Sequence, residues 1–90
     1  MKILILGGDA RMKVAYDQLL RQNLEVSTLG LFEGDNGSVA DADILLFPVP
    51  TTRDGSNVYC PLTNAVLPLD IVNDAKENAI ILSGGYVFQR

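Results

Sequence analysis

Hydrogen-bond donors follow three apolar runs of this sequence, and their chemistry suits the binding of an anion. The candidate binding residues are Gly8, Asp9, Arg11, Thr51, Thr52, Arg53, Ser83 and Gly84. A guanidinium presents a planar pair of N–H donors, and hydroxyls and loop amides add further donors, so this set suits a carboxylate or a phosphate. Taken singly, Arg11 and Arg53 are equally well explained as solvated surface charges. Asp9 is better suited to capping a helix than to binding, and it is also placed to orient Arg11.

The residues that most often carry catalysis and metal binding are scarce. The 90 residues contain no histidine and one cysteine, Cys60, which removes the commonest general base and metal ligand. A zinc site built from cysteine and histidine is excluded, as is an internal disulfide, which fits a reducing compartment. The sequence therefore predicts no metal site, and no residue is identified as a proton-transfer group.

The glycine pair Gly7-Gly8 raises the question of a nucleotide site. A dinucleotide fingerprint needs a third glycine and an acidic residue about twenty positions later. Here Asp9 and Arg11 follow instead, and a carboxylate at the start of a helix repels a pyrophosphate. Glu25 lies at the head of the next predicted strand, not at its end. The lysine of a P-loop and the hydroxyl-rich phosphate turn of flavodoxins are absent, so no cofactor site is predicted within these residues.

Apolar patterning predicts the elements that position these loops. Uninterrupted apolar runs are typical of strands that are buried on both faces of a parallel sheet, and a stripe at three- and four-residue steps is typical of a helix. The predicted strands are 3–6, 24–29, 42–47 and 79–82, and the predicted helices are 10–23 and 69–76. Residues 58–60 and 65–67 predict a small β-hairpin.

This order of elements predicts a single α/β domain. The expected fold is a flavodoxin-like or Rossmann-like three-layer fold, with a mostly parallel sheet of about four strands plus the small hairpin. In such sheets ligands bind beyond the carboxyl ends of the strands, so the three donor-bearing loops are expected to converge. A sheet of this kind normally continues past residue 90, and the chain is therefore expected to be a piece of a longer protein.

Net charge and hydropathy exclude some classes of binding partner. The formal net charge of −4 disfavours nucleic acid, which attracts basic surfaces. The first apolar run is too short for a signal peptide or a membrane span, so the sequence predicts a cytoplasmic protein without membrane contact.

Three segments, in this order, resemble the N-terminal domain of the dipicolinate synthase A subunit. They are Gly7-Gly8-Asp9-Ala10-Arg11 after a short apolar strand, Pro48-Val49-Pro50-Thr51-Thr52 with Gly55 beyond it, and Ile81-Leu82-Ser83-Gly84. The resemblance implies the flavodoxin-like, substrate-side domain of a two-domain oxidoreductase whose C-terminal domain carries the dinucleotide fingerprint. It implies NADP, or NAD, in the full-length protein and none in this domain, which is expected to be inactive alone.

The family makes dipicolinate during sporulation from a cyclic dicarboxylate of the dihydrodipicolinate pathway, together with a flavoprotein-like B subunit. A dicarboxylate substrate matches the donors described above, with Arg11 and Arg53 as its cationic partners and Thr51, Thr52 and Ser83 as hydrogen-bond donors. Two alternatives stay open. One is a non-catalytic module that docks a partner subunit through the hairpin around Tyr59 and Leu67 or through a sheet edge, and the other is a small nucleotide-binding domain. Self-association into a homo-oligomer also stays open.

Overall fold

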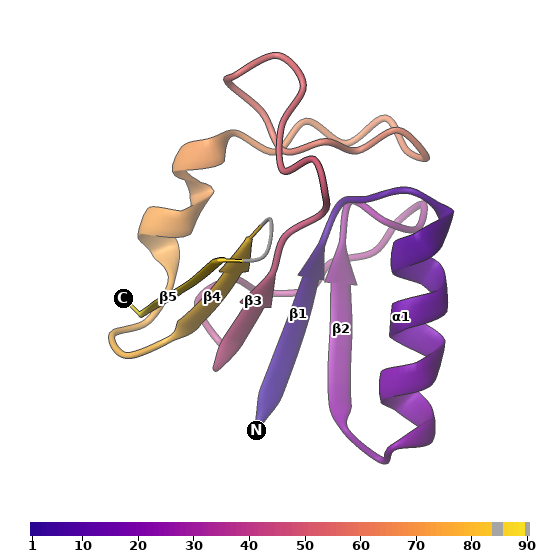
Figure 1. Cartoon of the computed structure of the whole chain (residues 1–90), viewed down its shortest axis with the longest axis vertical. Coiled ribbons are helices and arrows are strands. Elements are labelled where there is room, and N and C mark those ends of the chain that lie inside the picture. Colours follow the sequence, from indigo (N-terminus) through magenta and orange to yellow (C-terminus); the bar gives the residue numbers. More distant parts are fainter. Residues whose placement is uncertain (84–85, 90) are drawn as a thin grey trace.

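A five-stranded sheet forms the centre of the molecule (Figure 1). The computed structural model describes residues 1–83 and 86–89. The elements in chain order are β1 (Lys2–Leu6), α1 (Ala10–Arg21), β2 (Glu25–Leu29), β3 (Ile44–Leu46), the 3₁₀ helix η1 (Leu69–Asp74), β4 (Ile80–Ser83) and β5 (Tyr86–Gln89). Across the sheet the strands are ordered β2-β1-β3-β4-β5.

The first four strands are parallel. Ile5 of β1 lies between Thr28 of β2 and Leu46 of β3, and Leu46 in turn lies beside Leu82 of β4. The corners that follow β1, β3 and β4 therefore share one edge of the sheet. This confirms the predicted α/β fold with its mostly parallel sheet. The fifth strand, which the apolar pattern did not predict, pairs antiparallel with β4.

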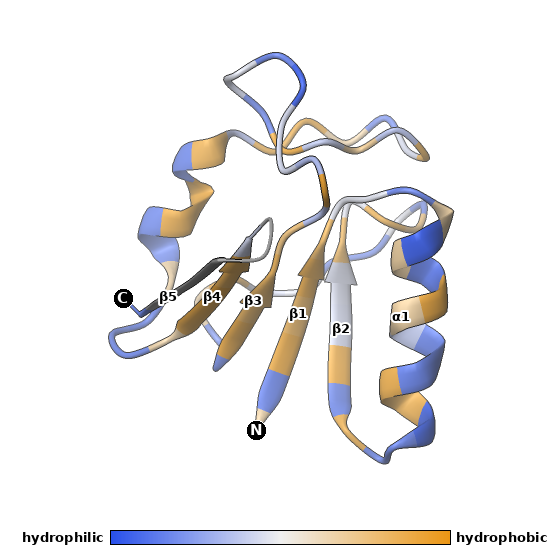
Figure 2. Ribbon diagram, viewed as in Figure 1, coloured by the Kyte–Doolittle hydropathy of each residue, from blue (hydrophilic) through white to orange (hydrophobic). Residues whose placement is uncertain are grey.

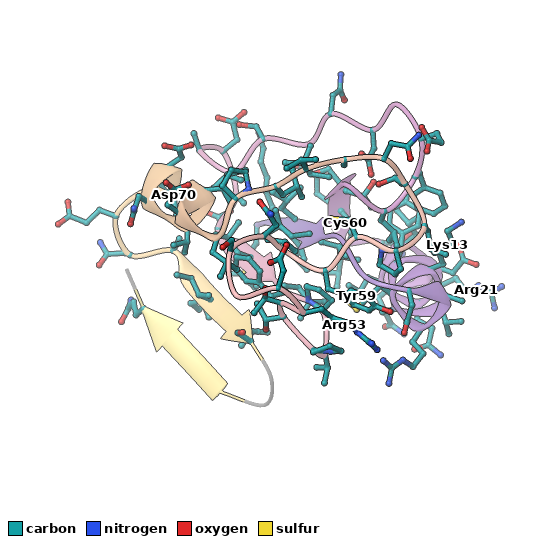
Figure 3. The ribbon with its side chains drawn as sticks, turned by 90° about the horizontal axis from the view of Figure 1, so that it is seen from above. Lys13, Arg21, Arg53, Tyr59, Cys60 and Asp70 are labelled. Atoms are coloured by element: carbon teal, nitrogen blue, oxygen red, sulfur yellow. The ribbon has the colours of Figure 1, made fainter. Side chains whose placement is uncertain are left out.

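The sheet separates two layers of covering structure. Leu4 and Leu6 of β1 and Leu45 of β3 are fully buried, and they belong to the core on the face that carries η1. Alternate residues point to the opposite face, where α1 packs beside β2. Figure 2 shows β1, β3 and β4 as mainly apolar strands and α1 as a mixed helix, which fits these positions. Seen from above, α1 and η1 lie on opposite sides of the sheet (Figure 3).

Helix α1 begins and ends through local chemistry. Asp9 caps its N-terminus, because the side chain accepts a hydrogen bond from the backbone N–H of Arg11. The predicted helix 10–23 ends two residues early, at Arg21. The N–H groups of Gln22 and Asn23 bond to carbonyls three residues back, and Asn23 has a left-handed backbone (φ +59°), which stops the helix.

Strand β3 is shorter than the predicted 42–47. The hydrogen bonds continue on both sides of it, from the Asp43 N–H to the Lys2 carbonyl at 2.8 Å and from the Phe47 N–H to the Leu82 carbonyl at 2.9 Å. Pro48 has no N–H to donate, so the pairing cannot extend further.

Two predicted elements between β3 and β4 differ from the structure. The predicted helix 69–76 is a 3₁₀ helix that ends at Asp74, where Ala75 turns to an extended backbone. The hairpin of 58–60 and 65–67 was wrong in its detail. A hydrogen bond from the Val58 N–H to the Leu67 carbonyl joins the two segments. Just beyond them lie an isolated antiparallel bridge between Asn57 and Pro68 and a hydrogen bond from the Leu69 N–H to the Ser56 carbonyl. Pro61 and Pro68, which directly follow the two segments, lack the N–H that a longer ladder would need.

Candidate functional site

The corner after β1 is fastened to a distant segment of the chain. Gly7 and Gly8 have positive φ values of +55° and +101°, and the Gly8 N–H donates to the carbonyl oxygen of Tyr59 at 2.8 Å. A Cβ atom on Gly7 would lie 2.5 Å from the same oxygen. Glycine is required here both for the backbone conformation and for this close approach. Gly8 therefore shapes the corner, while its own N–H is already bonded.

Arg11 is held by two partners. Its Nε lies 3.1 and 3.2 Å from the two carboxylate oxygens of Asp9, and its Nη2 donates to Asp9 at 3.0 Å. The same Nη2 donates to the carbonyl oxygen of Val49 at 2.7 Å. The side-chain hydrogen bond from Arg11 is the main reason that the pKa of Asp9 lies below its usual value. Arg11 thus ties the start of α1 to the loop after β3.

The first part of the loop after β3 is joined to the end of β4. The hydroxyls of Thr51 and Ser83 share a hydrogen bond of 2.6 Å, and the Thr51 hydroxyl also bonds to the Pro48 carbonyl at 3.1 Å. The Tyr59 N–H donates to the carbonyl of Thr51 at 2.8 Å. The structure therefore brings together two of the predicted binding hydroxyls. The predicted binding residue Gly84 lies outside the described residues.

Asp54 organises the outer part of this loop. Its carboxylate accepts the backbone N–H groups of Ser56 and Asn57, both at 2.8 Å, and the Asn57 side-chain amide at 3.0 Å. The N–H of Asn57, followed by that of Ser56, holds the pKa of Asp54 far below its usual value. The Thr52 hydroxyl donates to the same carboxylate and accepts the Gly55 N–H. Thr52, one of the predicted binding residues, thus closes its own loop, and its role in binding stays a prediction.

Arg53 projects from this loop over an aromatic ring. Its guanidinium carbon lies 4.8 Å from the centre of the Tyr59 ring, and Figure 3 shows the two side chains together. None of the ion pairs among the described residues includes Arg53. A cleft of about 180 Å³ opens beside this stack, lined in part by Asn57 and Cys60. Arg11 and Arg53 thus both belong to segments that meet at Tyr59.

A family model for the N-terminal domain of the dipicolinate synthase A subunit matches residues 2–87. The chain belongs to this family. The crystal structure of the dipicolinate synthase A subunit from Bacillus halodurans has a similar fold, with a TM-score of 0.74 at 20% sequence identity. That match covers 92% of this chain and 33% of the relative's chain, so this chain spans about a third of the relative's length. A comparison with curated protein sequences gives no significant match.

Sequence reasoning did not include Tyr59 among the candidate binding residues, although its ring lies under Arg53 and its backbone joins the corners after β1 and β3. It assigned Tyr59 to the hairpin and, with Leu67, to a docking surface for a partner. Leu67 is only 8% exposed and belongs to the core, while Val66 beside it is 73% exposed, so the docking surface stays a prediction. The signal that would have found Tyr59 is the run Asp54-Gly55-Ser56-Asn57, because such residues form tight turns and fold Arg53 back toward Tyr59.

The N-terminus of α1 does not fit the pyrophosphate of a dinucleotide. The Asp9 carboxylate occupies that terminus and places negative charge where a phosphate would bind. The nearest glycine N–H, that of Gly8, is bonded to Tyr59. This geometry agrees with the failure of the fingerprint spacing in the sequence.

A second hollow near the same edge is mainly apolar. It has a volume of about 260 Å³ and is lined by Phe47, Thr51, Leu69, Val72, Ile81 and Ser83. Its polar groups are the two bonded hydroxyls of Thr51 and Ser83. It can therefore accept an apolar ring edge more readily than a charge.

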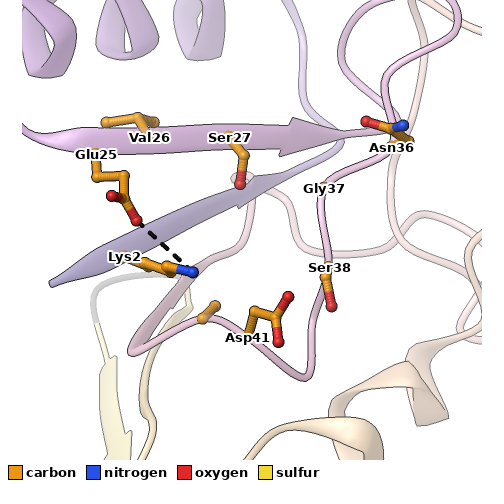
Figure 4. A pocket seen from close by; sticks show the side chains of 9 residues that line it. Lys2, Glu25, Val26, Ser27, Asn36, Gly37, Ser38 and Asp41 are labelled. Atoms are coloured by element: carbon orange, nitrogen blue, oxygen red, sulfur yellow. Dashed lines mark ion pairs between the residues drawn. The ribbon is translucent and has the colours of Figure 1, made fainter.

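A hollow at the other end of the strands has a different character (Figure 4). It measures about 320 Å³ and lies beside Lys2 and Glu25, the first residues of β1 and β2. These two side chains form an ion pair of 4.0 Å, and Asp41 adds a second carboxylate. Such a site suits an anion poorly, and it is remote from the predicted binding edge.

The described part of the chain contains no group of three metal-ligating residues and no helix with the length and apolar character needed to cross a membrane. Burial raises the pKa of the Cys60 thiol, so this side chain is neutral near pH 7. A neutral thiol is a poor nucleophile. The arrangement around Tyr59 is therefore suited to binding, and no described group in it is activated for covalent chemistry.

Proposed function

We propose that this domain binds the dicarboxylate substrate of a dipicolinate synthase A-type oxidoreductase. The observation that carries the proposal is that the segments of Arg11 and Arg53 meet at Tyr59, with Arg53 lying over its ring, at the edge where β1 and β3 end, in a chain of this family. A substrate with two carboxylates needs cationic N–H donors, and the hydroxyls of Thr51 and Ser83 lie in the same corner.

The wider role follows from the family. The domain would be the N-terminal, substrate-side part of a cytoplasmic enzyme that makes dipicolinate during sporulation and works with a B subunit. NADP, bound elsewhere in that enzyme, would supply the hydride acceptor. The residues of this chain would hold the carboxylates and orient the ring.

Titration of the 90-residue chain with pyridine-2,6-dicarboxylate tests the binding step. Two-dimensional ¹⁵N NMR should show saturable shifts of backbone amides in residues 51–59, and pyridine-3-carboxylate, with its single carboxylate, should bind more weakly. Absence of saturable shifts at millimolar ligand would overturn the proposal. In a complete enzyme that carries this domain, substitution of the binding arginine should raise the KM for the dicarboxylate and leave the KM for the nucleotide unchanged.

The alternative of a docking module would use the exposed Leu62 and Val66 of this segment, since Leu67 is buried, or a sheet edge. Gel filtration with and without a B subunit separates docking from substrate binding. Co-elution without any effect of the dicarboxylate would favour the module.

A further inference from the structure

The two arginines are equivalent in the sequence but not in the structure. Arg11 uses Nε and Nη2 to bond the carboxylate of Asp9 and the carbonyl of Val49. An anion that approaches Arg11 meets the Asp9 carboxylate 3.0 Å from the guanidinium. The positive charge of Arg11 is therefore largely offset before any ligand arrives.

Arg53 has its charge free for a ligand. Its neighbour Asp54 could neutralise it, but that carboxylate accepts from Ser56, Asn57 and Thr52. The guanidinium carbon lies over the Tyr59 ring, 4.8 Å from its centre, and no ion pair among the described residues includes Arg53. The N–H donors lie in the guanidinium plane and point outward from its edge. The contact with the ring therefore positions Arg53 without using its N–H donors in a hydrogen bond.

The support beneath Arg53 is itself anchored. The backbone of Tyr59 bonds on one side to the Gly8 N–H and on the other to the Thr51 carbonyl, both at 2.8 Å. The ring is thus carried by a segment that is tied to the corners after β1 and β3. The cleft beside the stack is also lined by the Asn57 amide, the neutral Cys60 thiol and the Asp54 carboxylate, whose oxygens accept the hydrogen bonds named above.

We infer that Arg53 is the carboxylate-binding residue of this domain, that Tyr59 is the residue that positions it, and that Arg11 is a structural brace. The inference rests on the proposed function and deepens it, because it says which of the two arginines meets the substrate. The ligand that fits is a small carboxylate whose oxygens take the two parallel donors of one guanidinium edge.

Four variants of the 90-residue chain test this assignment by titration with pyridine-2,6-dicarboxylate. Arg53→Gln should weaken binding about tenfold or more, because it removes charge-assisted hydrogen bonds. Arg11→Gln, the matched control, should change the Kd by less than about threefold. Tyr59→Leu should weaken binding by about two- to fivefold, the range of an exposed cation–π contact, and Tyr59→Phe should restore the wild-type Kd.

A spectroscopic measurement separates positioning from general structural damage. The Nε–H proton of Arg53 should show a ring-current shift in the wild type and in Tyr59→Phe, and lose it in Tyr59→Leu. If Tyr59→Leu does not fold, Arg53→Lys replaces it as the test, since lysine keeps the charge but not the flat stack, and its Kd should fall between those of the wild type and Arg53→Gln.

The outcomes distinguish the inference from the proposed function. Binding that is weakened by Arg11→Gln and unaffected by Arg53→Gln would overturn the inference and leave the proposed function standing. A Kd that is the same in Tyr59→Leu, or in Arg53→Lys, as in the wild type would overturn the positioning role of Tyr59. Failure of the wild-type chain to bind the dicarboxylate at all would overturn the proposed function, and the inference with it.

Discussion

The corner after β2 and the outer loop after β3 are each organised by one aspartate, yet the two aspartates have different consequences. Asp35 accepts the Thr28 hydroxyl and the N–H groups of residues 30–32, at 2.8 to 2.9 Å. Asp54 accepts four donors as well, but all of them come from exposed or half-buried residues of its own loop. The donors of Asp35 include the buried Thr28 and the fully buried Leu31.

The comparison shows that the structural role of a carboxylate depends on whether its hydrogen-bond donors belong to the buried core or to an exposed loop. Asp35 fixes the end of β2 to the core, so its loss should lower the stability of the whole domain. Asp54 shapes a loop that projects from the rim and carries Arg53. The first corner is a structural element, whereas the second is a rigid mount for a surface group.

Glycine substitutions should give the largest difference in stability between a packed corner, here the one after β1, and the open loop after β3. Gly7→Ala combines a left-handed backbone with contacts to the Tyr59 carbonyl and the Cys60 sulfur at 2.5 and 2.9 Å, and should lower the free energy of unfolding by about 3 kcal/mol or more. Gly55→Ala, at φ +80° with open space around it, should lower it by about 1 kcal/mol. Urea unfolding followed by circular dichroism measures both, and equal losses would contradict the contrast.

The second largest difference in stability is expected between Asp35→Asn and Asp54→Asn. Asp35→Asn should lower the free energy of unfolding by ~1–2 kcal/mol, because four donors lose a charged acceptor in a half-buried site. Asp54→Asn should leave global stability near that of the wild type and increase hydrogen exchange at residues 55–57. Thermal melts and exchange rates measure these effects. A larger global loss for Asp54→Asn would reverse the comparison.

The pH dependence sharpens the same contrast. Desolvation raises the pKa of Asp35, but the N–H groups of Phe32 and Gly30 and the Thr28 hydroxyl outweigh it, so the pKa lies below its ordinary value of 3.8. The stabilisation from Asp35 is therefore complete above pH 3.8 and is lost as the pH falls through the lower pKa of the folded state. The stability difference between wild type and Asp35→Asn should shrink as the pH is lowered below about 4. A difference that grows on acidification would show that this sign is wrong.

The smallest expected effect concerns the two arginines. Arg11→Gln should lower the melting temperature slightly at low salt and less at high salt, because its partner Asp9 is near the surface. Arg53→Gln should leave the melting temperature closer to the wild type, since no ion pair among the described residues is lost. Paired melts at two salt concentrations measure this, and a larger loss for Arg53→Gln would assign Arg53 a structural role.

Much of the fold was predictable because its signals are local. Uninterrupted apolar runs predicted β1, β3 and β4, and an alternating pattern predicted β2. Asp9 was correctly predicted to cap α1. The segment 58–67 was mispredicted because Val58 and Leu67 at its ends pack against the core, while residues between them, such as Val66, are exposed and unpaired with a neighbouring strand. Strand β5 was not predicted from the apolar pattern, because it forms by pairing with the edge of β4.

The sequence alone determined the family, the parallel sheet and the set of residues from which a binding site is built, because these depend on residue types and on spacing along the chain. Only the tertiary structure distinguished the two arginines. Arg11 meets the Val49 carbonyl, 38 positions away in the chain, while Arg53 is left resting on Tyr59 without a counter-charge among the described ion pairs. A guanidinium pairs with whichever acceptor the fold brings within reach, and that distance in space is not encoded in the spacing of the residues.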